Sequence, residues 1–219
     1  MRRTGRAGRA ALLVVAALVV AGCSTAPSSS TALSAQGLTQ ADDGWYGLPL
    51  TVERSLPDVT LTTTSGRPFR LDTELAGGPT LLFFGYSSCP DICPVHLASI
   101  ASAMEQTRTR YDQVRVVFVS VDPARDTPER IDTFLDHFDD RMIGLHAALP
   151  VVEEALTQLD LPGPIVEGPD PRGEGDLIGH PAQVIGFDAE GRARRVWPFG
   201  TRRSDWVADL PRIVADWSA

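Results

Sequence analysis

The stretch Thr80-Leu-Leu-Phe-Phe-Gly-Tyr-Ser-Ser-Cys-Pro-Asp-Ile-Cys-Pro94 joins an apolar run to a pair of cysteines. Residues 80–86 are almost continuously apolar, which predicts a strand buried on both faces of a sheet. Apolar residues within 97–104 recur at the spacing of one helix face, so a helix should follow. Cys89 and Cys93 therefore lie between a buried strand and a helix. Ligands bind at the carboxyl ends of strands in open α/β sheets, so we expect the functional site here.

The chain on either side of this stretch alternates between strand and helix patterns. On the amino side, the pattern predicts a hairpin over 60–71. On the carboxyl side it predicts, in order, a buried strand at 114–121, a helix starting at Thr127-Pro128, a short strand at 142–146, a helix over 152–159, a surface loop at 162–175, a hairpin of 182–188 and 192–199, and a terminal helix over 207–217 that Pro211 must kink or divide. This order predicts a thioredoxin-like α/β sandwich, with a mixed central sheet, helices on both faces and an N-terminal hairpin extension.

Composition excludes several classes of protein. The chain has 219 residues, 43% of them hydrophobic, which suits one globular domain with extensions. No strict glycine period or sustained heptad is present, so collagen-like and coiled-coil structures are excluded. The formal net charge of −8 makes nucleic acid an unsuitable partner.

The first 22 residues have the pattern of an export signal, because four arginines precede an apolar stretch at 10–21. That stretch is too short to span a bilayer comfortably. The sequence Val-Ala-Gly-Cys23 resembles the lipobox of bacterial lipoproteins, in which the cysteine is lipidated. We expect a lipoprotein signal peptide at 1–22, a flexible membrane tether at 23–44, and a folded domain at 45–219 on the extracytoplasmic face of the cell membrane. A simple cleaved signal or a single-pass anchor is the alternative.

The two remaining cysteines suit redox or metal chemistry. Cys89 and Cys93 each precede a proline, which disfavours helical backbone at both positions. We therefore expect Cys93 to cap the helix and Pro94 to be its first residue. Such a bent loop brings the sulfurs close enough to form a disulfide or to bind one metal ion. A stapling disulfide is the plainer interpretation for an exported protein, although so short a loop removes little chain entropy.

Three segments make the chain resemble the Sco/SenC copper chaperones, which are membrane-tethered thioredoxin-like proteins associated with cytochrome c oxidase assembly. They are FGYSSCPDICP at 84–94, VSVDPARDTPE at 119–129 and IGHPAQVIGFDAEG at 178–191. The resemblance covers roughly 56–199 and implies that Cys89, Cys93 and His180 bind copper. It also implies delivery to the copper-bearing subunit of cytochrome c oxidase or to another copper or thiol protein.

The donor chemistry agrees with that implication. Two thiolates and one imidazole are a soft set that suits Cu(I). Zinc is the chemical runner-up, but a structural zinc site normally has four protein ligands.

One departure from the family pattern leaves an enzymatic function as an alternative. The family usually has Asp-His followed by Ser or Thr, whereas this chain has Gly179-His180-Pro181. Pro181 falls where thioredoxin-like proteins carry a cis-proline facing redox cysteines. A thiol-disulfide oxidoreductase that keeps the metal-binding cysteines of a partner reduced is therefore the alternative function. The missing acidic neighbour also removes a partner for the His180 ring. A peroxiredoxin-like peroxidase ranks third, because the usual threonine three residues before the reactive cysteine is absent.

The other histidines and two aspartates are weaker candidates. His96 lies one helical turn after the cysteines and is expected to be exposed. His137 and His146 are expected to be structural. Asp122 and Asp126 are interpreted as a turn and helix-start device before Thr127-Pro128.

Overall fold

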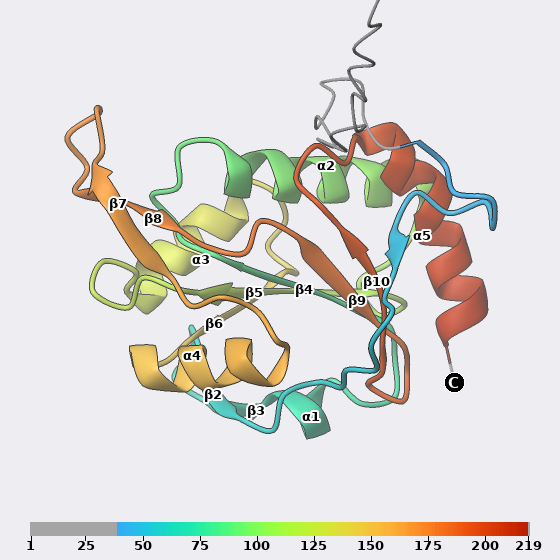
Figure 1. Ribbon diagram of the computed structural model, residues 1–219, viewed down its shortest axis with the longest axis horizontal. Helices are drawn as coiled ribbons and strands as arrows, with labels where there is room; N and C mark the ends of the chain where they lie inside the picture. Colours follow the sequence, from blue (N-terminus) through green and yellow to red (C-terminus); the bar gives the residue numbers. More distant parts are fainter. Residues whose placement is uncertain (1–38, 219) are drawn as a thin grey trace, which may run out of the picture. The chain divides into compact units, whose positions relative to one another are not determined.

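A computed structural model describes residues 39–218, and its centre is one mixed sheet (Figure 1). Within this range, eight strands pair in the order β1-β10-β9-β4-β5-β6-β2-β3. The strands of this sheet are β1 Leu48–Pro49, β2 Thr60–Thr63, β3 Pro68–Arg70, β4 Thr80–Gly85, β5 Arg115–Ser120, β6 Ile143–His146, β9 Val184–Phe187 and β10 Ala193–Trp197. The predicted mixed sheet is confirmed, since β4, β5 and β6 run parallel while β9 pairs antiparallel with β4.

The central strands β4 and β5 are buried because their side chains are apolar on both faces of the sheet. Every residue of β4 is buried, as the continuous apolar run predicts. Helices cover both faces: Figure 1 shows α2 and α4 on opposite sides of the sheet, and α5 packs against α2. The helices are α1 Leu71–Glu74, α2 Ile92–Thr107, α3 Pro128–Asp136, α4 Leu149–Gln158 and α5 Arg203–Trp217. This arrangement confirms the predicted α/β sandwich, including the hairpin of β2 and β3.

The predicted surface loop at 162–175 is wrong in part. Residues of this stretch form β7 Ile165–Pro169, which pairs antiparallel with β8 Asp176–Gly179 in a separate ribbon. Asp170 closes the turn, because its backbone N–H donates to Gly175 and its carboxylate binds Arg172. Most residues of β7 are exposed, so the strand carries no apolar alternation that the sequence pattern would reveal.

The predicted terminal helix is one continuous element. α5 is one helix that continues through Pro211, so the proline does not divide it. A proline inside a helix removes one backbone donor and crowds the preceding turn. Here the burial of Trp206, Leu210, Ile213 and Trp217 on one face outweighs that local loss.

The predicted signal peptide, the lipidation site Cys23 and most of the predicted tether lie outside the described residues. Asp43, near the end of that tether, forms an ion pair with Arg195, and its carbonyl accepts a hydrogen bond from Arg212. Across residues 39–218, none of the helices has the length and apolar character needed to cross a bilayer.

Candidate metal centre

The two cysteines lie where β4 passes into α2, but the helix begins earlier than expected. Asp91 is the N-cap, and its carboxylate accepts the backbone N–H of Ile92 at 2.6 Å. Cys93 is therefore a helical residue, so the prediction that it caps the helix is wrong. Pro94 remains acceptable because it lies in the first turn, where backbone N–H groups have no partner within the helix. The N-cap hydrogen bond of Asp91 thus outweighs the bias of Cys93, the residue before Pro94, against helical backbone.

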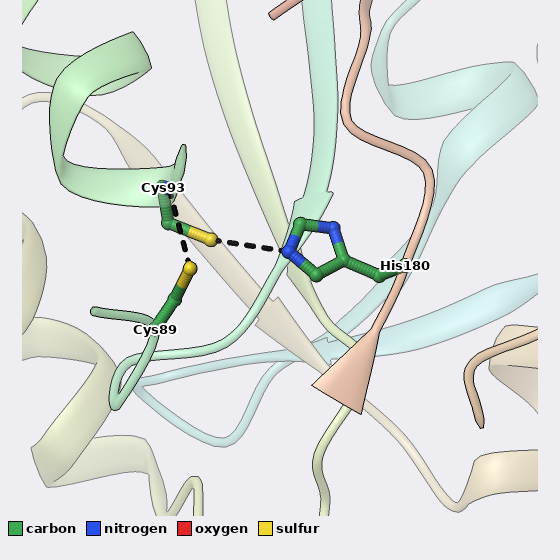
Figure 2. Close-up of side chains that lie close together, drawn as sticks. All are labelled: Cys89, Cys93 and His180. Atoms are coloured by element: carbon green, nitrogen blue, oxygen red, sulfur yellow. Dashed lines mark hydrogen bonds between the residues drawn. The ribbon is translucent and has the colours of Figure 1, made fainter. Parts of the chain in front are cut away.

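Cys89, Cys93 and His180 come together at this helix start (Figure 2). Their ligand atoms all lie within 4.8 Å of one another. The backbone N–H of Cys93 donates to the Cys89 sulfur at 3.4 Å, and the Cys93 sulfur lies 3.6 Å from Nε2 of His180. Both cysteines are free thiols, Cys93 fully buried and Cys89 7% exposed.

The His180 ring is oriented with Nε2 facing the sulfurs. Its Nδ1 lies 3.1 Å from the carbonyl oxygen of Pro181, and a carbonyl only accepts hydrogen bonds. Nδ1 therefore carries the proton, which leaves the Nε2 lone pair directed toward Cys93. The His180–Pro181 peptide is trans, as are all peptide bonds in the described range. The ring partner that an acidic neighbour would supply is thus a backbone carbonyl, which the sequence analysis missed.

The environment of the two thiols separates their acidities. The hydrogen bond from the Cys93 thiol lowers the pKa of Cys89 to about 4, with smaller contributions from backbone N–H donors, while burial opposes this shift. Burial raises the pKa of Cys93 well above its usual value, and the hydrogen bond to Cys89 adds to that shift. The pair therefore holds one thiolate at Cys89 beside one protonated thiol at Cys93.

Glycine is required at the end of β4 because the backbone there passes close to Cys93. A Cβ atom at Gly85 would lie 2.6 Å from the Cys93 sulfur and 2.9 Å from Cε2 of Phe118. No side chain fits at those distances without moving a sulfur or a core ring. The apolar pattern of the strand gives no sign of this requirement.

Asp126 stabilises the loop that carries the cysteines through hydrogen bonds to Ser87. Its buried carboxylate accepts the Ser87 hydroxyl at 2.5 Å, the Ser87 backbone N–H at 3.1 and 3.2 Å, and the Ser120 hydroxyl at 2.6 Å. The interpretation of Asp126 as a helix-start device is therefore wrong, and Thr127 is the cap of α3. Asp122 does form the turn, since its carbonyl accepts the backbone N–H of Asp126.

Two arginines attach the β7–β8 ribbon, which leads into His180, to the cysteine loop. Arg125 donates to the carbonyls of Glu174 at 2.8 Å and Asp176 at 2.7 Å. Arg172 donates to the carbonyl of Ser88 at 2.6 Å, directly before Cys89. The guanidinium of Arg125 also pairs with Asp122 and lies 5.4 Å from the centre of the Tyr86 ring.

The other histidines do not join the cluster of ligand atoms. The predicted exposure of His96 is wrong, because it is 1% exposed and its Nε2 lies 2.9 Å from the carbonyl oxygen of Ala182. Burial lowers the pKa of His96 to about 4. His137 is exposed and bonds the Thr133 carbonyl through Nδ1, while His146 lies on β6 opposite Thr62.

A small cleft reaches two of the three clustered residues, Cys89 and His180. It has a volume of about 240 Å³, and its lining includes Cys89, Glu167 and His180. A larger cleft of about 810 Å³, whose lining includes Arg108 and Tyr111, contains none of the three. We place the chemistry at the smaller cleft, because Cys89 and His180 of the Cys-Cys-His cluster line it.

The SCO1/SenC family model matches residues 52–215 of this chain. The chain belongs to the SCO1/SenC family. Among SCO1/SenC relatives, a putative copper-binding protein of Stutzerimonas stutzeri is 36% identical over 112 residues, which is 50% of this chain and 54% of that protein. The chain thus spans about half the length of this relative.

Solved structures of the SCO1/SenC family share the fold. Bradyrhizobium japonicum ScoI with copper bound is 29% identical, has a TM-score of 0.61, and aligns over 76% of this chain and 98% of its own. Apo Sco1 of Thermus thermophilus is 31% identical, has a TM-score of 0.66, and aligns over 77% of this chain and 96% of its own. These likenesses agree with the thioredoxin-like architecture described above.

Proposed function

We propose that this protein is a copper chaperone that binds one Cu(I) ion through Cys89, Cys93 and His180 and passes it to a partner protein. The observation that carries this function is the convergence of the two free thiols and one imidazole nitrogen within 4.8 Å. Thiolates are the ligands that Cu(I) prefers, and an imidazole completes a soft set of low coordination number. The copper-bound relative B. japonicum ScoI supports the same assignment.

The site suits a cargo that is held and then released. The sulfurs are largely shielded from water, which protects a reactive ion from solution. Cys89 and His180 nevertheless line an open cleft, so an incoming ligand reaches the ion there first. We propose, from the family resemblance, that the recipient is the binuclear copper site of cytochrome c oxidase.

A metal titration of the reduced full-length protein in mild detergent tests this function. We expect one Cu(I) per chain and an affinity for Cu(I) far above that for Zn(II), because only three protein ligands converge. A matched protein whose two cysteines have been oxidised to a disulfide should bind no Cu(I), because a disulfide offers no thiolate. Equal copper binding by the reduced and oxidised proteins would contradict the proposal.

A thiol-disulfide reductase is the second candidate, and the contrast between the thiols favours it. Cys89 has a lowered pKa and lines the cleft, so it suits the role of the attacking thiolate. Cys93 is buried beside it with a raised pKa and suits the role of the resolving thiol. Reduction of a disulfide in a partner would leave Cys89 and Cys93 joined and two partner thiols reduced. A turnover assay with a disulfide-containing peptide and an external thiol reductant measures this activity, and a rate equal to that of the Cys93→Ser variant would rule it out.

We further propose that the protein is lipid-anchored through Cys23 on the extracytoplasmic face of the cell membrane. The arginine-rich start, the short apolar stretch and Val-Ala-Gly-Cys23 support this location. The variant Cys23→Ser should remain uncleaved or appear outside the membrane fraction. Unchanged electrophoretic mobility together with unchanged membrane retention would contradict the anchor.

A further inference from the structure

The connection from β8 to β9 carries His180 but has little support from the sheet. Residues 180–183 belong to neither strand and form no ladder pairs. Two hydrogen bonds reach this segment from another element within the described part of the chain. One joins the Cys93 sulfur to His180, and the other joins Nε2 of His96 to the carbonyl of Ala182. Both come from α2.

The ring of His96 has one nitrogen with a partner and one without. Ala182 offers a carbonyl oxygen at 2.9 Å, so Nε2 carries the proton and donates. The opposite nitrogen, Nδ1, is buried and has no hydrogen-bond partner among the described residues. A buried unpaired acceptor is unfavourable for stability, so a plain aromatic ring would suit this side of the pocket better. A histidine at position 96 is therefore best explained by the hydrogen bond that its Nε2–H donates to the carbonyl of Ala182.

Aromatic rings fix the position from which His96 donates. Its ring centre lies 5.3 Å from that of Phe83 and 5.8 Å from that of Phe199. Phe83 also contacts the His180 ring, with 6.0 Å between centres. The two histidines thus pack on one shared ring of β4, although they come from elements 84 positions apart.

We propose that His96 is a positioning residue for His180, holding the 180–182 segment against the helix that carries Cys93. This inference rests on the proposed role of His180 as a metal ligand. Pro181 lies between the two bonded residues, and its ring restricts the backbone dihedral φ. The Pro181 carbonyl in turn accepts from Nδ1 of His180. A carbonyl fixed at Ala182 therefore limits the rotation of the whole segment and keeps Nε2 of His180 directed at the Cys93 sulfur.

The first test measures Cu(I) affinity of the reduced full-length protein by competition with a chromogenic Cu(I) chelator. His96→Phe keeps the ring and removes the donor, so affinity should fall about tenfold, the lower end of the range for losing an indirect partner of a metal ligand. His96→Gln is the matched control, because its amide donates to the same carbonyl, and it should stay within about threefold of wild type. An unchanged affinity of His96→Phe would overturn the inference.

A double-mutant cycle separates positioning from general damage. If His96 acts through His180, then His96→Phe should change affinity less than twofold in a His180→Ala background. A tenfold loss in both backgrounds would overturn the inference, because His96 would then act on the thiols or on the fold. If His180→Ala leaves affinity unchanged, the proposed ligand set fails instead.

A copper-free measurement judges the inference even if the ligand set fails. Nitrogen-15 NMR of the metal-free protein reports which ring nitrogen of His180 carries the proton. Wild type and His96→Gln should show the Nδ1–H form, whereas His96→Phe should show a mixture of both tautomers. A pure Nδ1–H form in His96→Phe would overturn the positioning role.

Discussion

Nε2 of His180 lies 3.6 Å from the Cys93 sulfur, although 87 positions separate the two residues. The contact follows from the antiparallel pairing of β9 with β4, which brings the start of β9 beside the end of the strand that leads to the cysteines. His180 precedes β9 and Cys93 lies in the first turn of α2, so both occupy the same end of the sheet. Sheet topology therefore completes a three-residue cluster from two distant parts of the chain.

The variant His180→Ala should separate the two candidate functions. Loss of an imidazole ligand should weaken Cu(I) binding at least about 10–100-fold, because losing an indirect partner already costs that much. Both thiols remain, so reduction of a disulfide substrate should continue at nearly the wild-type rate. Copper competition and a reductase assay on one preparation measure both, with the exposed His137→Ala as control. Affinity within twofold of wild type would contradict the ligand role.

Alkylation of the reduced, metal-free protein should show that Cys89 reacts as a thiolate. Its pKa is lowered to about 4, so the thiolate fraction is nearly constant above pH 5. The rate with iodoacetamide should therefore stay flat between about pH 5 and 8, where an ordinary thiol speeds up about tenfold for each pH unit. In Cys93→Ala, loss of the donor thiol should raise the pKa and restore that slope. Mass spectrometry locates the label, and a tenfold-per-unit slope in the wild type would refute the prediction.

Asp126→Asn should destabilise the protein through the cysteine loop. The buried carboxylate accepts hydrogen bonds from Ser87 and Ser120, and an amide of the same shape loses the charge that strengthens them. The free energy of unfolding should fall by about 1.5–3 kcal/mol, the range for hydrogen bonds to charged groups. Urea denaturation measures this change, with the exposed Asp132→Asn as control. Equal stability of the two variants would show that the Asp126 network contributes little.

Arg125→Ala should loosen the β7–β8 ribbon while leaving the central sheet intact. The guanidinium donates to the carbonyls of Glu174 and Asp176, and each such bond is worth roughly 1.5–3 kcal/mol. Because the substitution removes both bonds, the protection of ribbon amides against hydrogen exchange should fall by at least about tenfold. Mass-spectrometric exchange over residues 165–179 tests this, with Arg110→Ala, an exposed ion-pair residue, as control. Unchanged protection would mean that the ladder alone holds the ribbon.

Much of the fold could be predicted from local patterns. The apolar run of β4, the amphipathic spacing of α2 and the Thr127-Pro128 start of α3 all depend on near neighbours in the chain. The type of element at each of these positions was therefore predicted correctly. The ribbon of β7 and β8 was not predicted, because exposed strands bury no face and show no alternation.

The sequence by itself determined the central strands, the helices and the cysteine pair, because periodicity, turn residues and cysteine spacing act over a few residues. His180 was predicted as a ligand only through the resemblance of 178–191 to the Sco/SenC family. Only the tertiary structure decided the burial of His96, the contact of Asp126 with Ser87 and the carbonyl partner of His180. These features depend on contacts between groups that are distant in the sequence. The pairing of β9 with β4 brings such groups together, because its hydrogen bonds join segments about a hundred positions apart. Local propensity depends only on near neighbours in the chain and therefore does not predict such contacts. The chemistry of the site depends on residues from several elements that only the folded chain brings together.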